Sequence, residues 1–202
     1  VFGCLIPFLD KPVHVDDANF LRLAEGAQAD FWRPHEVMIN WQGSTQRAFD
    51  VLSNPPGIAW VLSPVTDKPV WFQHLWMWPW VLMALWGMGR LGKVFVGQRE
   101  ASILILGLSP LFLLAAQGLT PDIPLLACAT AGLGGFLSHR KSSSVYALLA
   151  GCAVLFRYSG VCMIPLVLLA GMLTKRTVSA LFSALPLAAL LLHDWHAYGE
   201  LH

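Results

Sequence analysis

The chain has 202 residues, of which 56% are hydrophobic and 12% are charged, and its formal net charge is +1. So apolar a composition argues against a soluble domain and favours a protein embedded in a lipid bilayer. The near-zero charge argues against a nucleic-acid partner, because no basic patch is present to neutralise phosphates.

The chain opens on an apolar stretch, residues 1–9, that is too short to cross a bilayer. We interpret it as the outer end of a truncated first transmembrane helix, and the chain as the N-terminal fragment of a longer protein. Residues 10–69 form the only long polar stretch and are expected to be an extracytoplasmic loop carrying the pair Asp16-Asp17. Within it, residues 18–29 have apolar positions on one helical face, which predicts a helix lying in the membrane surface. Asp16 or Asp17 stands where its N-cap would be, and residues 33–53 are expected to be irregular.

Six apolar segments follow within residues 70–193, and each is expected to cross the membrane: 70–89, 101–117, 122–138, 144–156, 160–174 and 178–193. Three of the short loops between them carry seven basic residues, which marks their side as cytoplasmic. The polar loop then faces outward, as does a further extracytoplasmic loop that begins at residues 194–202. The predicted fold is an all-α, multi-pass transmembrane helical bundle, and we expect a bacterial inner membrane.

This topology places almost all of the 12 Asp and Glu residues outside, with Glu100 as the exception. Carboxylates gathered at one mouth of a hydrophobic bundle favour a site for chemistry or ion handling over plain solubility. The pair Asp16-Asp17 leads these carboxylates along the chain, and Asp122 lies at the outer mouth of a predicted helix. The sequence therefore predicts a site on the outer face.

Four segments, taken in order, resemble the GT-C membrane glycosyltransferases, and in particular the protein O-mannosyltransferases and the lipid A aminoarabinose transferases. They are KPVHVDDANFLRLAEGA, NPPGIAWVLSP, GLTPDIPLLACATAGL and FRYSGVCMIPL. The first is similar to the family's acidic pair before a surface helix, and the second to its Pro-Pro segment. The third is similar to its Thr-Asp-x-Pro-Leu segment, here with Pro121 inserted before Asp122, and the fourth to its Thr-Lys-x-x-Gly-x-x-x-Pro stretch.

The resemblance implies transfer of a sugar from a polyprenyl-phosphate carrier to a lipid or protein acceptor at the extracytoplasmic face. It implies that Asp16 is the catalytic base and that Asp17 orients Asp16 or contacts a ligand. The alternative is that one of the two aspartates only caps the surface helix. Such a transfer needs a carboxylate for the acceptor hydroxyl and positive charge for the leaving phosphate.

Two further residues at the outer helix ends have two interpretations each. Asp122 either caps its helix or joins Asp16 as a second site carboxylate. Arg157 either binds the phosphate of the carrier, a task suited to a guanidinium fork, or forms a salt bridge to Asp122 or Asp194.

The segment HDWHAYGELH at the end of the chain places His196, Glu200 and His202 close together in sequence. Histidine and carboxylate at such spacing predict a site for a divalent metal or for the acceptor. The alternative is a solvated interfacial loop. In similar transferases a glutamate near the Pro-Pro segment helps to hold a metal, but here Leu52, Ser53 and Asn54 precede Pro55.

Two other classes of function remain alternatives to the glycosyltransferase. One is a transporter or channel component that binds a cation or polar solute with the same acids, although no inverted repeat or midplane break is seen in the sequence. The other is a non-catalytic membrane scaffold. Close approach of Asp16 to Asp122 would favour the enzyme, whereas scattered carboxylates would favour the scaffold.

Overall fold

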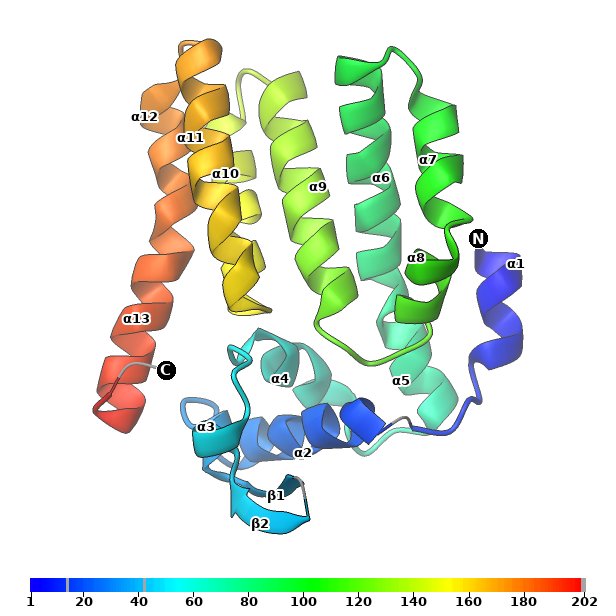
Figure 1. Cartoon of the computed structure of the whole chain (residues 1–202), viewed down its shortest axis with the longest axis vertical. Coiled ribbons are helices and arrows are strands. Elements are labelled where there is room, and N and C mark those ends of the chain that lie inside the picture. Colours follow the sequence, from blue (N-terminus) through cyan, green and yellow to red (C-terminus); the bar gives the residue numbers. More distant parts are fainter. Residues whose placement is uncertain (14, 42, 201–202) are drawn as a thin grey trace.

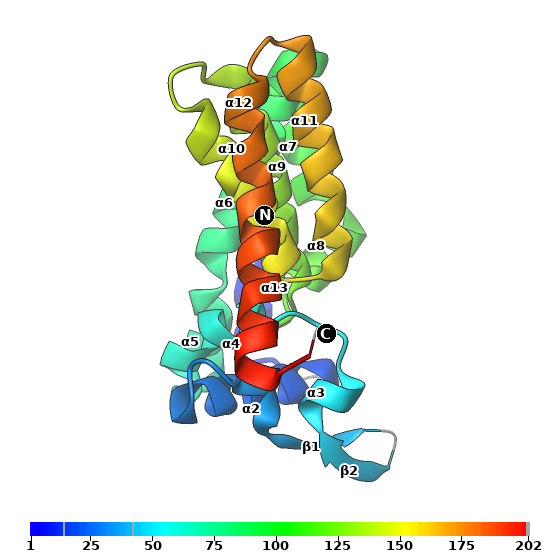
Figure 2. The same cartoon turned by 90° about the vertical axis from the view of Figure 1, so that its left-hand side faces the viewer.

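The computed structural model describes residues 1–13, 15–41 and 43–200 and is predominantly helical, as predicted. Upright helices stand side by side above a layer of shorter elements at one end of the molecule, here called the polar end (Figure 1). A view from the side shows the same two parts (Figure 2). The upright helices are α6 (Trp78–Phe95), α7 (Arg99–Gly107), α8 (Pro110–Ala115), α9 (Asp122–Ser138), α10 (Ser143–Gly151), α11 (Met163–Leu173), α12 (Thr177–Ala180) and α13 (Leu185–Tyr198).

The polar end is built from residues that lie between the first turns of the chain and α6. The chain begins with α1 (Phe2–Leu5) and a 3-10 turn at Ile6–Phe8. The layer itself contains α2 (Val15–Ala29), the strands β1 (Met38–Trp41) and β2 (Ser44–Arg47), α3 (Ala48–Val51), α4 (Gly57–Leu62) and α5 (Val70–Trp76).

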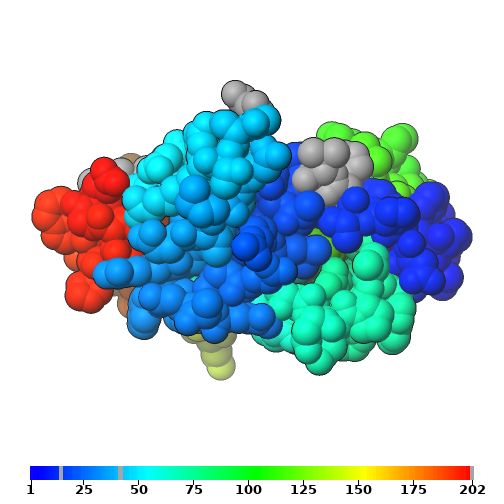
Figure 3. All heavy atoms as spheres, turned by 90° about the horizontal axis from the view of Figure 1, so that it is seen from below, coloured from blue at the N-terminus to red at the C-terminus, as the bar shows by residue number. Residues whose placement is uncertain are grey.

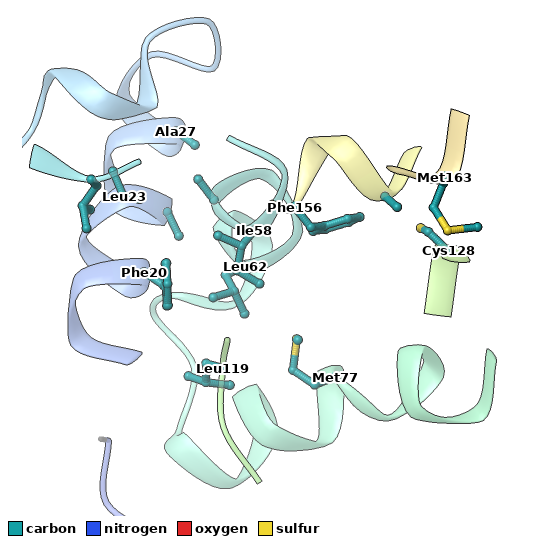
Figure 4. Close-up of a cluster of buried hydrophobic side chains, with 14 of the residues drawn as sticks. Phe20, Leu23, Ala27, Ile58, Leu62, Met77, Leu119, Cys128, Phe156 and Met163 are labelled. Atoms are coloured by element: carbon teal, nitrogen blue, oxygen red, sulfur yellow. The ribbon is translucent and has the colours of Figure 1, made fainter. Parts of the chain in front are cut away.

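Helix α2 is the predicted surface helix, and its apolar face packs on α4. Phe20 and Leu23 are buried on α2, and Ile58 and Leu62 are buried on α4, so the two helices share one core (Figure 4). Because α2 begins at Val15, Asp16 and Asp17 lie inside its first turn. The prediction that one of them is the N-cap is therefore wrong. Acidic side chains in a first turn still interact favourably with the positive end of the helix dipole.

The upright helices approach one another closely through glycines. On Gly87 of α6, a Cβ would lie 2.2 Å from the backbone nitrogen of Ala131 in α9. Only a residue without a side chain allows the two backbones to meet at this distance. This contact fixes α9, and with it the residues at its N-terminus, relative to the rest of the bundle.

The predicted segments lie where the structure has helices, but several of them are divided into two shorter helices. Segment 122–138 coincides with α9, while segment 101–117 is divided into α7 and α8 because Pro110 cannot continue the preceding helix. Segment 70–89 is divided into α5 and α6. Segment 144–156 is α10 with a 3-10 turn, and Arg157 separates it from segment 160–174, as expected. The last segment runs on to Tyr198 and ends at Gly199, which is left-handed (φ 77°), so residues 194–198 are helix and not loop.

Residues 33–53 are more regular than predicted. β1 and β2 form an antiparallel hairpin in which Met38 pairs with Arg47, and Gly43 has a φ of +85° in the connection. Ile39 is buried and its neighbour Met38 is exposed, so the strand follows a two-residue alternation that is too short to stand out in the sequence.

Among the described residues, one continuous helical stretch, Thr177–Tyr198, is long and apolar enough to cross a membrane by length and composition. A single stretch of this kind also occurs in the cores of soluble proteins, so it does not by itself establish a bundle that crosses the membrane several times. The connections α6–α7, α9–α10 and α11–α12 all lie at the end opposite the polar end (Figure 1). Of the seven basic residues, Arg140, Lys141, Lys175 and Arg176 lie in the last two connections, whereas Arg90 and Lys93 lie in α6 and Arg99 begins α7.

Candidate functional site

A small cavity lies at the polar end, between the start of α2 and the lower ends of the upright helices. Its volume is about 150 Å³. Three of the predicted site residues line it together, although they come from α2, α9 and the turn after α10. The lining residues are Asp16, Asn19, Phe20, Leu52, Asn54, Thr120, Asp122 and Arg157. We call this space the acidic cavity.

The two adjacent aspartates have different environments. Asp16 is exposed and lines the acidic cavity. Asp17 is buried, and its Oδ1 accepts a hydrogen bond of 2.9 Å from the backbone N–H of Leu119. That bond ties α2 to the segment just before α9, so Asp17 holds the chain that positions the cavity. Consecutive residues on a helix point about 100° apart, which is why only one of the pair faces the cavity.

Asp122 and Arg157 form a two-pronged ion pair at the cavity wall. The Nε of Arg157 lies 3.1 Å from Oδ1 of Asp122, and its Nη2 donates to Oδ2 at 3.3 Å. Both side chains remain nearly half exposed, at 46% and 43%. An exposed pair contributes only about 0–1 kcal/mol, so a phosphate can compete with Asp122 for the guanidinium. Because α9 has Pro121 as its N-cap, the prediction that Asp122 caps α9 is wrong.

A second, larger cavity of about 620 Å³ adjoins the acidic cavity and shares Thr120 and Asp122 with it. Its walls are largely apolar and come from the chain around Phe8 and from α8, with Lys11 and Asp17 at its polar side. We call it the apolar groove. The remaining lining residues are Leu111, Leu114, Ala115, Gln117 and Gly118.

Three residues of these cavities were not predicted from the sequence. The hydroxyl of Thr120 is buried and has no hydrogen-bond partner among the described residues, although it lies between the two cavities. Asn54 lines the acidic cavity, and Lys11 lines the apolar groove. Only their positions beside recognised motifs could have pointed to two of them. Thr120 precedes Pro121 and Asp122, and Asn54 precedes the Pro-Pro pair.

The two described residues predicted for a metal, His196 and Glu200, lie outside the acidic cavity and the apolar groove. His196 and Glu200 are exposed on the end of α13 and on the residues after it, and His202 is outside the described residues. Within the described part of the chain, no three His, Cys, Asp or Glu side chains lie close enough to hold a metal ion. Helix α13 ends at Tyr198 and Gly199 is left-handed, so Glu200 lies beyond the helix and not one turn after His196 on the same helical face.

Two neighbouring residues of α13 are buried instead. Nδ1 of His193 lies 3.0 Å from Oδ1 of Asp194, and both side chains are more than nine-tenths buried. The rings of Trp32 and Trp60 lie against His193, at centroid distances of 6.0 and 5.4 Å. This pair therefore belongs to the contact between α13 and the polar end, and not to the acidic cavity.

Comparison of the chain with protein-family models, with curated proteins and with solved structures gives no match. The function must therefore be argued from the residues of the acidic cavity and the apolar groove. These residues offer an exposed carboxylate, a guanidinium fork, a buried hydroxyl without a partner and an adjoining apolar channel.

Proposed function

We propose that the chain belongs to a multi-pass membrane glycosyltransferase that moves a sugar from a polyprenyl-phosphate carrier to an acceptor on the outer face. One observation carries the proposal: Asp16, Asp122 and Arg157 line the same cavity, although 35 residues separate the last two and more than 100 separate them from Asp16. That meeting of charges favours a catalytic site over a scaffold with scattered carboxylates.

The chemistry assigns one role to each charge. The hydroxyl oxygen of the acceptor attacks the anomeric carbon of the donor sugar, and Asp16 takes the hydroxyl proton. The bond from the anomeric carbon to the phosphate oxygen breaks, and its electron pair stays on the phosphate. Arg157 stabilises the charge that develops there, because a guanidinium fork matches two phosphate oxygens. Asp122 holds Arg157 in place until the phosphate arrives.

The apolar groove suits the lipid part of such a donor. It adjoins the acidic cavity at Thr120 and Asp122, so a phosphate at Arg157 would have its isoprenoid chain next to Leu111 and Leu114. Lys11 adds a positive charge near the same groove. The unpartnered hydroxyl of Thr120 can donate to a phosphate oxygen that bridges the two spaces.

Exposed apolar residues on the upright helices support a bundle that crosses the membrane several times. Ile105, Leu111 and Leu173 are 73%, 77% and 77% exposed on three different helices. Lipid tails would cover such side chains, whereas water would not be a favourable neighbour for so many of them. The apolar helices shorter than a usual span would be accommodated by local thinning of the bilayer.

Cysteine labelling tests this topology. Ser44 and Ser142 are exposed at opposite ends of the bundle, and Cys4 and Cys162 are the exposed native thiols to be replaced by serine first. We expect a membrane-impermeant thiol reagent to label Ser44→Cys in intact cells. Ser142→Cys should be labelled only after the membrane is opened. Labelling of both in intact cells would contradict the proposed number of crossings.

The activity is tested by sugar transfer. Membranes carrying the complete protein are supplied with labelled polyprenyl-phosphate sugars, and label that enters lipid, glycan or protein fractions is counted against membranes without the protein. We expect protein-dependent transfer from at least one donor. No transfer from any donor, with the protein intact in the membrane, would instead favour the transporter or the scaffold.

A further inference from the structure

A second polar and aromatic site lies at the other end of α2, where the residues after this helix meet the end of α13. Two cavities of about 550 and 540 Å³ adjoin there and share Trp32, His196 and Ala197 in their walls. Figure 3 shows the end of α13 at one edge of the polar end and the N-terminal residues at the opposite edge. We call these two adjoining cavities together the α13 groove. The residues that matter for its chemistry are Asp30, Trp32, Arg33, His193, Trp195 and His196.

The groove contains a buried polar group that is not satisfied by the protein. His193 lines it and is 8% exposed, yet its Nε2 has no hydrogen-bond partner among the described residues. The other ring nitrogen lies 3.0 Å from Asp194, which favours the tautomer with the proton on Nδ1. Nε2 is then an acceptor, which a hydroxyl or amide donor would satisfy. A buried polar atom without a partner costs free energy, so a bound ligand that supplies the partner is favoured.

The walls of the two cavities combine flat aromatic faces with polar groups of both signs. Trp32 and Trp195 are 62% and 64% exposed, although they are large apolar side chains. Asp30 and Arg33 stand beside Trp32 and add an acceptor and a donor. A lipid tail would not pair with these polar groups, and a phosphate would be repelled by Asp30. A ligand with apolar faces edged by many hydroxyl groups satisfies all of them.

We propose that the α13 groove binds an extended, hydroxyl-rich glycan, which is the acceptor class of the proposed transferase. The role of the glycan as acceptor rests on the proposed function, whereas the binding of a glycan in the groove does not. The length of α2 between Asp16 and Ala29 is about 20 Å at 1.5 Å per residue, so a short sugar could not touch both sites. A glycan of several units held at Trp32 would extend along α2 and present one hydroxyl near Asp16.

The test measures binding and not turnover. The complete protein in lipid nanodiscs is titrated with maltopentaose, cellopentaose and chitopentaose, and contact is followed by saturation-transfer NMR. We expect at least one of these pentasaccharides to bind. Trp32→Ala should weaken that binding about tenfold, the loss that follows truncation of an aromatic anchor. Because Trp32 and Trp195 are exposed, their alanine variants should fold.

A matched variant separates this site from a general role of tryptophan at the membrane surface. Trp71 is also exposed (45%) but lies on α5 and outside the groove, so Trp71→Ala should leave glycan affinity unchanged. Binding of a pentasaccharide without any sugar transfer would support the glycan site in the α13 groove and contradict the proposed transferase function. Failure of all three pentasaccharides to bind, or equal affinities in the Trp32 and Trp71 variants, would overturn the groove.

Discussion

Replacing Asp16 by asparagine is expected to lower sugar transfer by about 10²–10⁴-fold, the contribution usual for a positioned general base. The change keeps the size of the side chain but replaces one carboxylate oxygen by an amide nitrogen, which removes the negative charge and the ability to take a proton. Because Asp16 is exposed, its loss should not alter folding. Transfer is measured with membranes carrying equal amounts of the wild-type and variant proteins.

The matched control for this experiment lies on the same helix. Glu25 is an exposed carboxylate of α2 that pairs with Arg22 and lies outside the acidic cavity. Glu25→Gln removes the same charge from the same element, so transfer should stay near the wild-type rate. Near-normal turnover of the Asp16→Asn protein would show that Asp16 is not the base. Equal losses in both variants would point to the charge of α2 as a whole.

Replacing Arg157 by alanine is expected to weaken binding of the polyprenyl-phosphate donor by about 10–150-fold. This range corresponds to about 1.5–3 kcal/mol for a charge-assisted hydrogen-bonded contact. Arg157→Lys keeps the charge and loses the fork, so its affinity should fall between those of the wild type and the alanine variant. Donor affinity is measured by titration of a short-chain polyprenyl-phosphate sugar into the purified protein.

Asp122→Asn distinguishes binding from structure. If Arg157 only completes a salt bridge, the Arg157→Ala and Asp122→Asn proteins should lose the same small stability and bind the donor equally well. If Arg157 binds phosphate, only the Arg157→Ala change weakens binding of the donor. The Asp122→Asn change leaves the guanidinium free to bind the phosphate. The melting temperatures should change little in both variants, since exposed ion pairs contribute about 0–1 kcal/mol.

Local features of the fold were predictable because they depend on neighbours in the sequence. The apolar face of residues 18–29 identified α2, and the unbroken run at 122–138 identified α9. Arg157 and the residues after it ended the preceding helix, as expected of a polar interruption. The short strands were missed because four residues, with a single buried Ile39, carry too little pattern to be distinguished from an irregular loop.

The sequence by itself determined the order of apolar and polar segments along the chain. Apolar residues form the helical segments, and most of the acids, together with Arg157, lie outside them. Only the tertiary structure decided their pairing. Packing of Phe20 and Leu23 against α4 sets the rotation of α2, which turns Asp16 toward the acidic cavity and buries Asp17 against Leu119. Similarly, α13 continues past residue 193 and ends at the left-handed Gly199, so Glu200 lies beyond the helix that carries His196. Rotation and helix length are set by contacts between distant segments, and a single sequence does not record those contacts.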